Sequence, residues 1–169
     1  MLKKSLSTAG IAILVTLVLF MIYGIVEKII ANKSMVDKIQ SLNVGPLFKM
    51  DSTHYKANPS TPTVLIYFNS TCEHCQYELA EIKKNTSLFE NISIVLMSFE
   101  NIDLIKKVGD DFEMGRTPNI EFVKINRDDV FETYGSLATP HIFIYAKDQK
   151  LIKEFKGETK IDAIVKHLP

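Results

Sequence analysis

An uncharged run of 22 residues near the amino terminus, from Ser5 to Val26, is the strongest constraint on how this chain folds. A helix over this run, with a rise of about 1.5 Å per residue, is about 33 Å long and can cross a hydrocarbon core of about 30 Å. A cleaved signal peptide is the alternative, but it needs a shorter apolar region followed by small residues, and Ile29, Ile30 and Ala31 lack that pattern. We therefore predict a retained membrane anchor over residues 1–30.

The lysines around this run predict its orientation. Lys3 and Lys4 precede it, and positive charge favours the cytoplasmic side, so the rest of the chain should be exported. Lys28, Lys33 and Lys38 on the far side weaken this prediction, although long domains translocate largely regardless of charge. Export also suits the pair of cysteines, because disulfides persist outside the cytosol. We expect a domain on the extracytoplasmic side, held by one amino-terminal helix.

The remainder of the chain has the length of one domain. Residues 31–45 carry scattered charges and end in turn-forming residues, which predicts a linker. Residues 46–169 leave about 124 residues, enough to bury a single core. Lys and Arg together number 20, as do Asp and Glu, so no excess positive charge attracts nucleic acid. These counts exclude a multidomain enzyme and give no reason to expect nucleic-acid binding.

The domain sequence alternates between strand and helix patterns. Val64–Phe68 is a short apolar run typical of a strand buried on both faces, and an amphipathic helix should follow it up to about Phe89. The other predicted elements are strands at Ile92–Phe99 and Ile120–Ile125 with a helix at 104–112 between them, a short helix from Asp128 to Gly135, a hairpin of His141–Tyr145 and Leu151–Phe155, and a terminal helix that starts at Thr159 with Asp162 in a near capping box. This order predicts an α/β fold.

The two cysteines lie between the first buried strand and its helix, in the sequence Cys72-Glu73-His74-Cys75. This position places the Cys72 sulfur near the free backbone amides and the positive end of the helix dipole, which stabilise a thiolate. Cys75, one turn inside the helix, should be more buried. We therefore predict that Cys72 attacks a disulfide and that Cys75 resolves the mixed disulfide by attacking Cys72.

A cysteine pair has two other common uses, a zinc site and a structural disulfide. A zinc site needs further ligands, but there is no second cysteine pair, and His54, His141 and His167 lack metal-ligand spacing. An inert structural disulfide that closes so short a loop restrains the unfolded chain only weakly. We favour a redox-active pair and expect neither a metal nor another cofactor.

The C-x-x-C helix after a buried strand, with Thr139-Pro140 before a hairpin and a terminal helix, resembles the thioredoxin superfamily. The amino-terminal anchor makes the chain most similar to the membrane-anchored, extracytoplasmic TlpA/ResA-like thiol-disulfide oxidoreductases. This resemblance covers residues 46–169 and implies a thioredoxin-like fold with a central mixed sheet flanked by helices. It also implies that Thr139-Pro140 is a cis-proline peptide that faces the disulfide. A trans proline at the start of a strand is the alternative.

Three residues in and after the motif gain roles by the same resemblance. Glu78 matches a glutamate that tunes the thiols of ResA-like proteins; the alternative is a solvated helix carboxylate. Of the two residues between the cysteines, Glu73 resembles the residue found there in ResA-like proteins. His74 resembles the second residue of the dipeptide in the strongly oxidising DsbA. A charged His74 would stabilise the Cys72 thiolate and make the disulfide more oxidising, and Glu73 would act in the opposite direction. Simple exposure at the helix start is the alternative for His74.

The predicted function is an anchored oxidoreductase that exchanges disulfides with exported proteins through Cys72 and Cys75. We expect it to act as a reductant, with electrons from a membrane partner. A peroxidase of the peroxiredoxin type is disfavoured, because Leu65 and Asn69 stand where that family has proline and threonine or serine. The remaining alternative is a redox-inactive, thioredoxin-fold binding module of an envelope complex.

Overall fold

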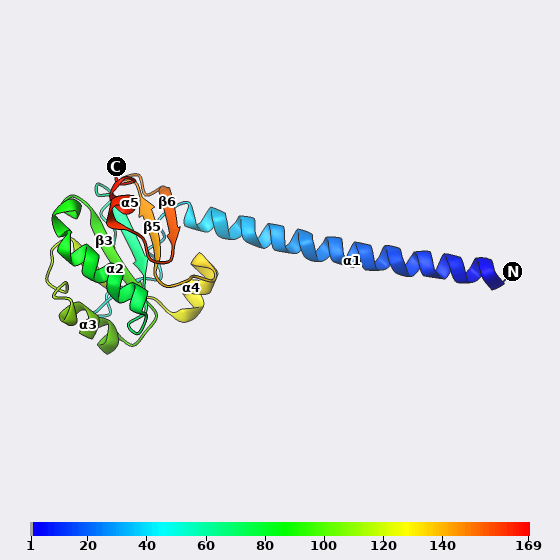
Figure 1. The fold of residues 1–169 in the computed structure, drawn as a ribbon, viewed down its shortest axis with the longest axis horizontal. Coiled ribbons are helices and arrows are strands. Elements are labelled where there is room, and N and C mark those ends of the chain that lie inside the picture. The colour runs from blue at the N-terminus through cyan, green and yellow to red at the C-terminus, as the bar shows by residue number, and fades with distance from the viewer. Residues whose placement is uncertain (1) are drawn as a thin grey trace. The chain divides into compact units, whose positions relative to one another are not determined.

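The structure is a computed structural model that describes the backbone of residues 2–169 and the side chains of residues 10–31, 33–34 and 36–169. The chain divides into two units, Met1–Asp37 and Lys38–Pro169. The first unit consists of most of helix α1 (Leu2–Ile39), and the second contains the sheet and the other helices (Figure 1). We describe each unit by itself.

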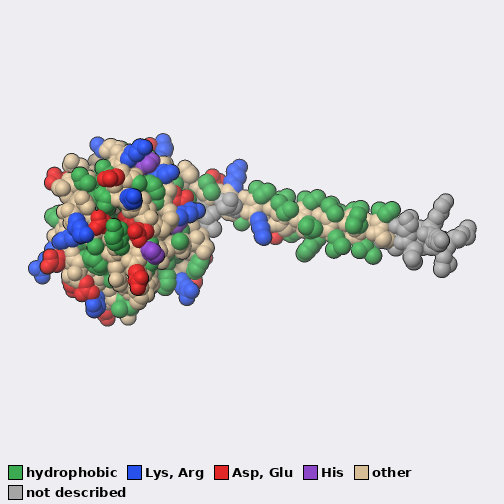
Figure 2. All heavy atoms as spheres, in the orientation of Figure 1, with side chains coloured by type: hydrophobic (Ala, Val, Ile, Leu, Met, Phe, Trp, Pro, Cys, Tyr) green, Lys and Arg blue, Asp and Glu red, His purple; other side chains and the backbone are tan. Residues whose placement is uncertain are grey.

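Helix α1 has the length and composition needed to cross a membrane, from Gly10 to Ile39. Its large apolar side chains are exposed, as for Phe20, which is 75% exposed. Figure 2 shows these hydrophobic side chains along the helix. An apolar surface of this extent is rarely left in water. The apolar helix that we predicted from the uncharged run is thus present in the structure.

Residues 31–45, for which we predicted a linker, include the end of helix α1 and two buried residues. Helix α1 continues to Ile39, and both Ile39 and Leu42 are buried in the core of the second unit. The backbone amide of Leu42 donates a hydrogen bond to the carbonyl of Gln149 at 2.9 Å. Packed structure therefore begins before residue 46, because the apolar residues that follow the anchor cover one face of the sheet.

The second unit is built on a mixed sheet of six strands in the order β1-β4-β3-β2-β5-β6. Strands β2, β3 and β4 are parallel, whereas β1, β5 and β6 run antiparallel to their neighbours. All five residues of β2 are buried, as its continuous apolar sequence predicted. The strands are β1 (Phe48–Lys49), β2 (Thr63–Tyr67), β3 (Ser93–Ser98), β4 (Ile120–Lys124), β5 (His141–Tyr145) and β6 (Leu151–Lys156).

Both faces of the sheet are covered. The helices are α2 (Glu73–Lys84), α3 (Ile102–Asp111), α4 (Arg127–Tyr134) and α5 (Ile161–Val165), with a 3-10 turn, η1 (Thr86–Phe89). Leu79 of α2, Ile105 of α3 and Ile164 of α5 belong to one core cluster. Tyr134 of α4 packs in the second cluster with Leu47 of the segment that follows α1. The central sheet flanked by helices is therefore the predicted thioredoxin-like fold.

Three predicted helix ends differ from the structure. The helix after the cysteines ends at Lys84, and the residues up to Phe89 form a separate 3-10 turn after Asn85 leaves the helical conformation. Helix α4 follows Asn126 and has no side-chain cap, so Asp128 does not cap it, although Gly135 ends it as predicted, with φ of 76°. Helix α5 begins at Ile161 and not at Thr159.

The core clusters predict unequal effects for two leucines on helices. Leu79 is 1% exposed, so Leu79→Ala leaves a cavity and should lower the free energy of unfolding by about 2–5 kcal/mol. Leu104, on α3, is 45% exposed, and Leu104→Ala should cost less than about 1 kcal/mol. Denaturant unfolding of the chain in detergent micelles measures both values. Equal losses for the two variants would contradict this packing.

Candidate active site

The carboxyl end of the central strand β2 places the cysteines at the start of α2. Cys72 is the N-cap residue of this helix, with φ of −82° and ψ of 114°, and Cys75 lies in its first turn. Both are free thiols; Cys72 is partly exposed, whereas Cys75 is 1% exposed. The difference in burial between the two cysteines is the one that the C-x-x-C spacing predicted.

The Cys72 sulfur lies between two backbone groups. The amide of Cys75 donates to Cys72 Sγ at 3.4 Å, and the Cys72 thiol donates to the carbonyl oxygen of Thr139, also at 3.4 Å. Partial burial opposes ionisation of Cys72, but hydrogen bonds with Cys75 and with the His74 backbone lower its pKa. The Thr139–Pro140 peptide bond is cis. Thr139 and Pro140 thus lie where the resemblance implied, against the first cysteine.

Cys75 has the opposite electrostatic environment. Burial raises the pKa of its thiol to about 12, and a hydrogen bond with Cys72 acts in the same direction. At neutral pH the Cys72 thiol therefore ionises far more readily than the Cys75 thiol. A group that removes the proton from Cys75 is needed before Cys75 can attack.

Glu78 is a buried carboxyl group on the same helix. It is 1% exposed, so it is not a solvated helix carboxylate. The backbone amide of Thr159 donates to Glu78 Oε2 at 2.7 Å, whereas Oε1 has no hydrogen-bond partner among the described residues. Burial raises the pKa of Glu78 to about 7, although the bond from Thr159 opposes this change. Thr159, which we predicted as the start of the terminal helix, thus binds the carboxyl group of Glu78 through its backbone amide.

His74 and Glu73 are the two exposed residues of the segment Cys72–Cys75, which we call the cysteine turn. The His74 side chain is 72% exposed, and its Nδ1 lies 2.7 Å from Glu158 Oε2. This hydrogen bond with Glu158 raises the pKa of His74. Glu73 is exposed in the first turn of α2, where a negative charge is favourable to the helix dipole. The structure therefore places His74 in a specific pair that the sequence did not predict.

Glu100 holds the loop before the cysteines and was also missed by the sequence analysis. Its carboxylate accepts hydrogen bonds from the Ser70 backbone amide and the Ser70 hydroxyl, both at 2.7 Å. Gln76 donates to the Ser70 carbonyl at 2.9 Å. Because β3 runs parallel to β2, the residues after each strand meet at one edge of the sheet. Parallel pairing of these two strands therefore places Glu100 near Ser70.

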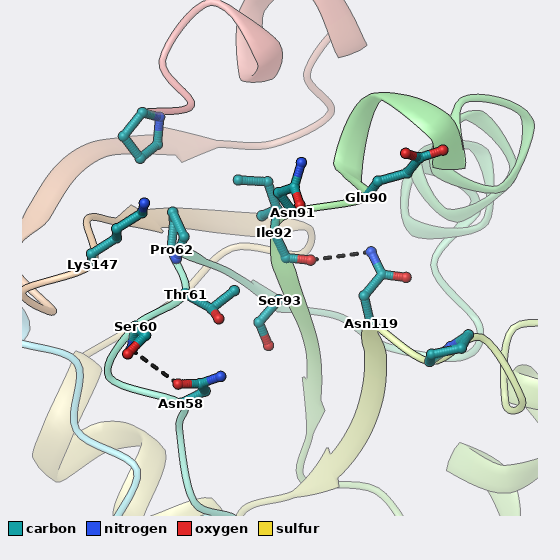
Figure 3. Close-up of a pocket in the computed structure, with 12 residues that line it drawn as sticks. Asn58, Ser60, Thr61, Pro62, Glu90, Asn91, Ile92, Ser93, Asn119 and Lys147 are labelled. Carbon is teal, nitrogen blue, oxygen red and sulfur yellow. Dashed lines mark hydrogen bonds between the residues drawn. The ribbon is translucent and has the colours of Figure 1, made fainter.

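A polar hollow of about 650 Å³ lies away from this site. Ser60 and Pro62 line it just before β2, Ser93 begins β3, and Asn119 precedes β4, so it lies at the amino ends of the parallel strands (Figure 3). The cysteines follow the carboxyl end of β2, at the opposite edge. Among the described residues, no cluster of His, Cys, Asp or Glu side chains could hold a metal ion. The hollow is therefore separate from the cysteine site.

Several solved structures share this fold at low sequence identity. A secreted disulfide oxidoreductase from Mycobacterium tuberculosis, homologous to E. coli DsbE, has a TM-score of 0.62 and 10% identity over 78% of this chain and 96% of that chain. The thioredoxin domain of a thiol-disulfide oxidoreductase from Bacteroides vulgatus has a TM-score of 0.57 and 18% identity over 75% and 93%. A peroxiredoxin-like protein from Aquifex aeolicus has a TM-score of 0.58 and 16% identity over 75% and 85%.

These likenesses establish the fold of the second unit. A search of curated proteins found no match. The family model of the thioredoxin-like domain matches residues 48–169, which is most of the chain and includes both cysteines, Glu78 and the cis-proline peptide. The chain therefore belongs to the thioredoxin-like domain family.

Proposed function

We propose that this chain is a membrane-anchored oxidoreductase that reduces disulfides of exported proteins. The observation that carries this proposal is the asymmetry of the two thiols: Cys72 is accessible with a lowered pKa, and Cys75 is buried with a raised pKa. A structural disulfide requires no such difference. Thiol-disulfide exchange does, because one thiol attacks the substrate and the other must wait until the mixed disulfide has formed.

In the first step, the Cys72 thiolate attacks one sulfur of the substrate disulfide. A bond forms between Cys72 and that sulfur, the substrate S–S bond breaks, and the second substrate sulfur leaves as a thiolate that takes a proton from water. The amide of Cys75 and the other free amides of the helix start favour the negative charge on Cys72 before the attack.

In the second step, Cys75 resolves the mixed disulfide. We assign Glu78 as the base that accepts the Cys75 proton, because it lies one turn further along α2, is buried, and has a pKa of about 7. The Cys75 thiolate attacks Cys72, the Cys72–substrate bond breaks, and the departing substrate thiolate takes up the proton. The substrate gains two electrons and two protons, and the enzyme is left with a Cys72–Cys75 disulfide.

The proposed direction is reduction of the substrate. The raised pKa of Cys75 disfavours a second thiolate in the reduced enzyme and so favours donation of electrons by the dithiol, whereas the lowered pKa of Cys72 acts in the opposite direction. Two electrons and two protons from a membrane partner would restore the dithiol.

The proposed location is the outer side of a membrane, with α1 as an uncleaved anchor. The length and apolar surface of α1 support this placement, as does the likeness to a secreted oxidoreductase. We assign residues 1–30 to the anchor. The sheet domain, which contains residues 46–169 and also packs Ile39 and Leu42 of the predicted linker, would then face exported proteins with Cys72.

Trapping of substrates tests the reaction. Cys75→Ser retains the nucleophile but removes the resolving thiol, so mixed disulfides between Cys72 and exported proteins should accumulate and disappear when a reductant is added. Cys72→Ser should trap nothing. A non-reducing gel of cells that express each variant measures the difference.

The wild-type chain in micelles, assayed with a model protein disulfide, is the control for this trapping experiment. Trapping by Cys72→Ser but not by Cys75→Ser would reverse the two roles. If neither variant traps a protein and the wild type reduces no disulfide, the chain is a redox-inactive binding module.

Labelling in intact cells tests the proposed location. A membrane-impermeant maleimide should label Cys72 after mild reduction, because the domain lies outside the cytoplasm and Cys72 is partly exposed. Cys72→Ser is the control for labelling at this position. Labelling that appears only after the membrane is permeabilised, or a mature chain that begins after residue 26, would contradict an exported domain on a retained anchor.

Replacement of the buried carboxyl group should change how the second step depends on pH. In the wild type, Glu78 becomes a base as the pH rises through about 7, so the rate at which Cys75 resolves a mixed disulfide should rise over the same range. Glu78→Gln should slow this step at least about tenfold at pH 8 and remove the rise near pH 7. Stopped-flow measurement of resolution gives the profile, and Glu90→Gln, which removes an exposed carboxylate away from the site, is the control.

The same variant should alter stability in a pH-dependent way. In the folded chain the pKa of Glu78 is raised from 4.5 to about 7, so folding favours the protonated carboxyl group. The resulting contribution to the free energy of unfolding is fully present below pH 4.5 and is lost as the pH rises to about 7. Glu78→Gln should therefore gain stability relative to the wild type between these values, up to about 3 kcal/mol at pH 8. An unchanged rate profile together with an unchanged stability profile would make Glu78 an ordinary helix residue.

A further inference from the structure

Three consecutive residues between β6 and α5 contact three different parts of the active site. The amide of Gly157 donates to the carbonyl of Pro140 at 2.9 Å. Glu158 Oε2 lies 2.7 Å from Nδ1 of His74, between the two cysteines. The amide of Thr159 donates to the buried Glu78 at 2.7 Å. We call residues 157–159 the 157–159 segment.

The backbone of this segment determines where the Glu158 carboxylate lies. Gly157 has φ of 87°, a backbone conformation that residues other than glycine rarely adopt. The Thr159 hydroxyl donates a hydrogen bond to the Gly157 carbonyl at 3.0 Å. Both neighbours of Glu158 are therefore held by hydrogen bonds to Pro140 and Glu78. Glu158 is placed against His74 by the fold and is not a long side chain that meets the ring by chance.

Three titratable groups act on the His74 ring. Glu158 comes from the 157–159 segment, whereas Cys72 and Glu73 belong to the cysteine turn itself. Of these, Glu158 makes the hydrogen bond to the ring, and the Cys72 sulfur is the group whose charge matters for exchange. A protonated His74 favours the thiolate of Cys72, because an opposite charge nearby stabilises the ionised form.

We propose that Glu158 is a positioning residue for the nucleophile: it holds a protonated His74 at the helix start and thereby extends the reactivity of the Cys72 thiolate through neutral pH. This inference rests on the proposed function, in which Cys72 attacks the substrate. Glu158 acts through His74 and does not itself touch the reacting sulfur atoms. The 157–159 segment thus contacts both His74, beside the attacking Cys72, and Glu78, the proposed base for Cys75.

The pH–rate profile for alkylation of Cys72 by iodoacetamide tests this role in the reduced 169-residue chain in detergent micelles. Alkylation consumes the Cys72 thiolate, forms a C–S bond and releases iodide, so it needs no exchange partner. Glu158→Gln removes the charge that holds the proton on His74, so the pKa of the ring should fall towards the ordinary histidine value. The rate should fall about threefold at pH 7.5, since one nearby exposed charge is lost.

The expected loss is confined to a window of pH. Well below and well above the pH range in which the ring titrates, its charge is the same in both proteins, so the rates should agree within experimental error at either end. Glu158→Asp keeps the charge and should lie closer to the wild type than Glu158→Gln. Asp162→Asn removes an exposed carboxylate from α5 that caps no helix amide and should leave the profile unchanged.

A second background separates action through His74 from a direct effect of the Glu158 charge. In His74→Asn, the additional change Glu158→Gln should no longer slow alkylation at pH 7.5. Equal slowing in both backgrounds, or a loss that is independent of pH, would overturn the proposal. So would an unchanged titration of His74 in Glu158→Gln, followed by nuclear magnetic resonance of the ring protons.

The two proposals fail in different ways. If Glu158→Gln slows alkylation only near neutral pH but Cys75→Ser traps no protein, the role of Glu158 stands and the proposed exchange with exported proteins fails. If trapping succeeds but Glu158→Gln matches the wild type at every pH, the exchange stands and the role of Glu158 fails.

Discussion

The site depends on one constraint, the burial of β2 on both faces at the centre of the sheet. This strand pairs with β3 on one side and with β5 on the other. The chain leaves its carboxyl end and enters the first turn of α2. The inward face of that helix carries Cys75, Glu78 and Leu79, and its start carries Cys72. The strand β5 then brings the Thr139–Pro140 peptide to the same edge. The chemistry follows from this placement.

One turn of helix produces opposite effects on neighbouring ionisable groups. At the helix start, backbone amides favour the charged form of Cys72, whereas one turn further the core disfavours the charged forms of both Cys75 and Glu78. A buried carboxyl group with an unpaired oxygen costs stability at neutral pH. Such a cost is typical of a functional site, where a base with a pKa near 7 can exchange a proton with a buried thiol.

The sequence predicted the elements whose signals are local. The apolar run of β2, the amphipathic face of α2 and Gly135 after α4 each depend on residues close in the chain, and the structure confirms them. The pairs His74–Glu158 and Glu78–Thr159 join residues more than eighty positions apart, and no periodicity reports them. Thr159 shows why: its capping pattern was read locally, but its amide bonds to a carboxyl group that only the folded chain brings near. The burial of Ile39 and Leu42 likewise depends on the sheet face that they cover, which no local pattern reports.

The unequal ionisation of the two thiols is the central claim, and a thiolate titration of the reduced chain tests it most directly. Ultraviolet absorbance followed against pH should show one thiolate that forms below the ordinary cysteine pKa of about 8.5 and is lost in Cys72→Ser. The second thiolate, lost in Cys75→Ser, should form only near pH 12. Two thiols that ionise together in the ordinary range, or Cys75 ionising first, would contradict the assigned roles.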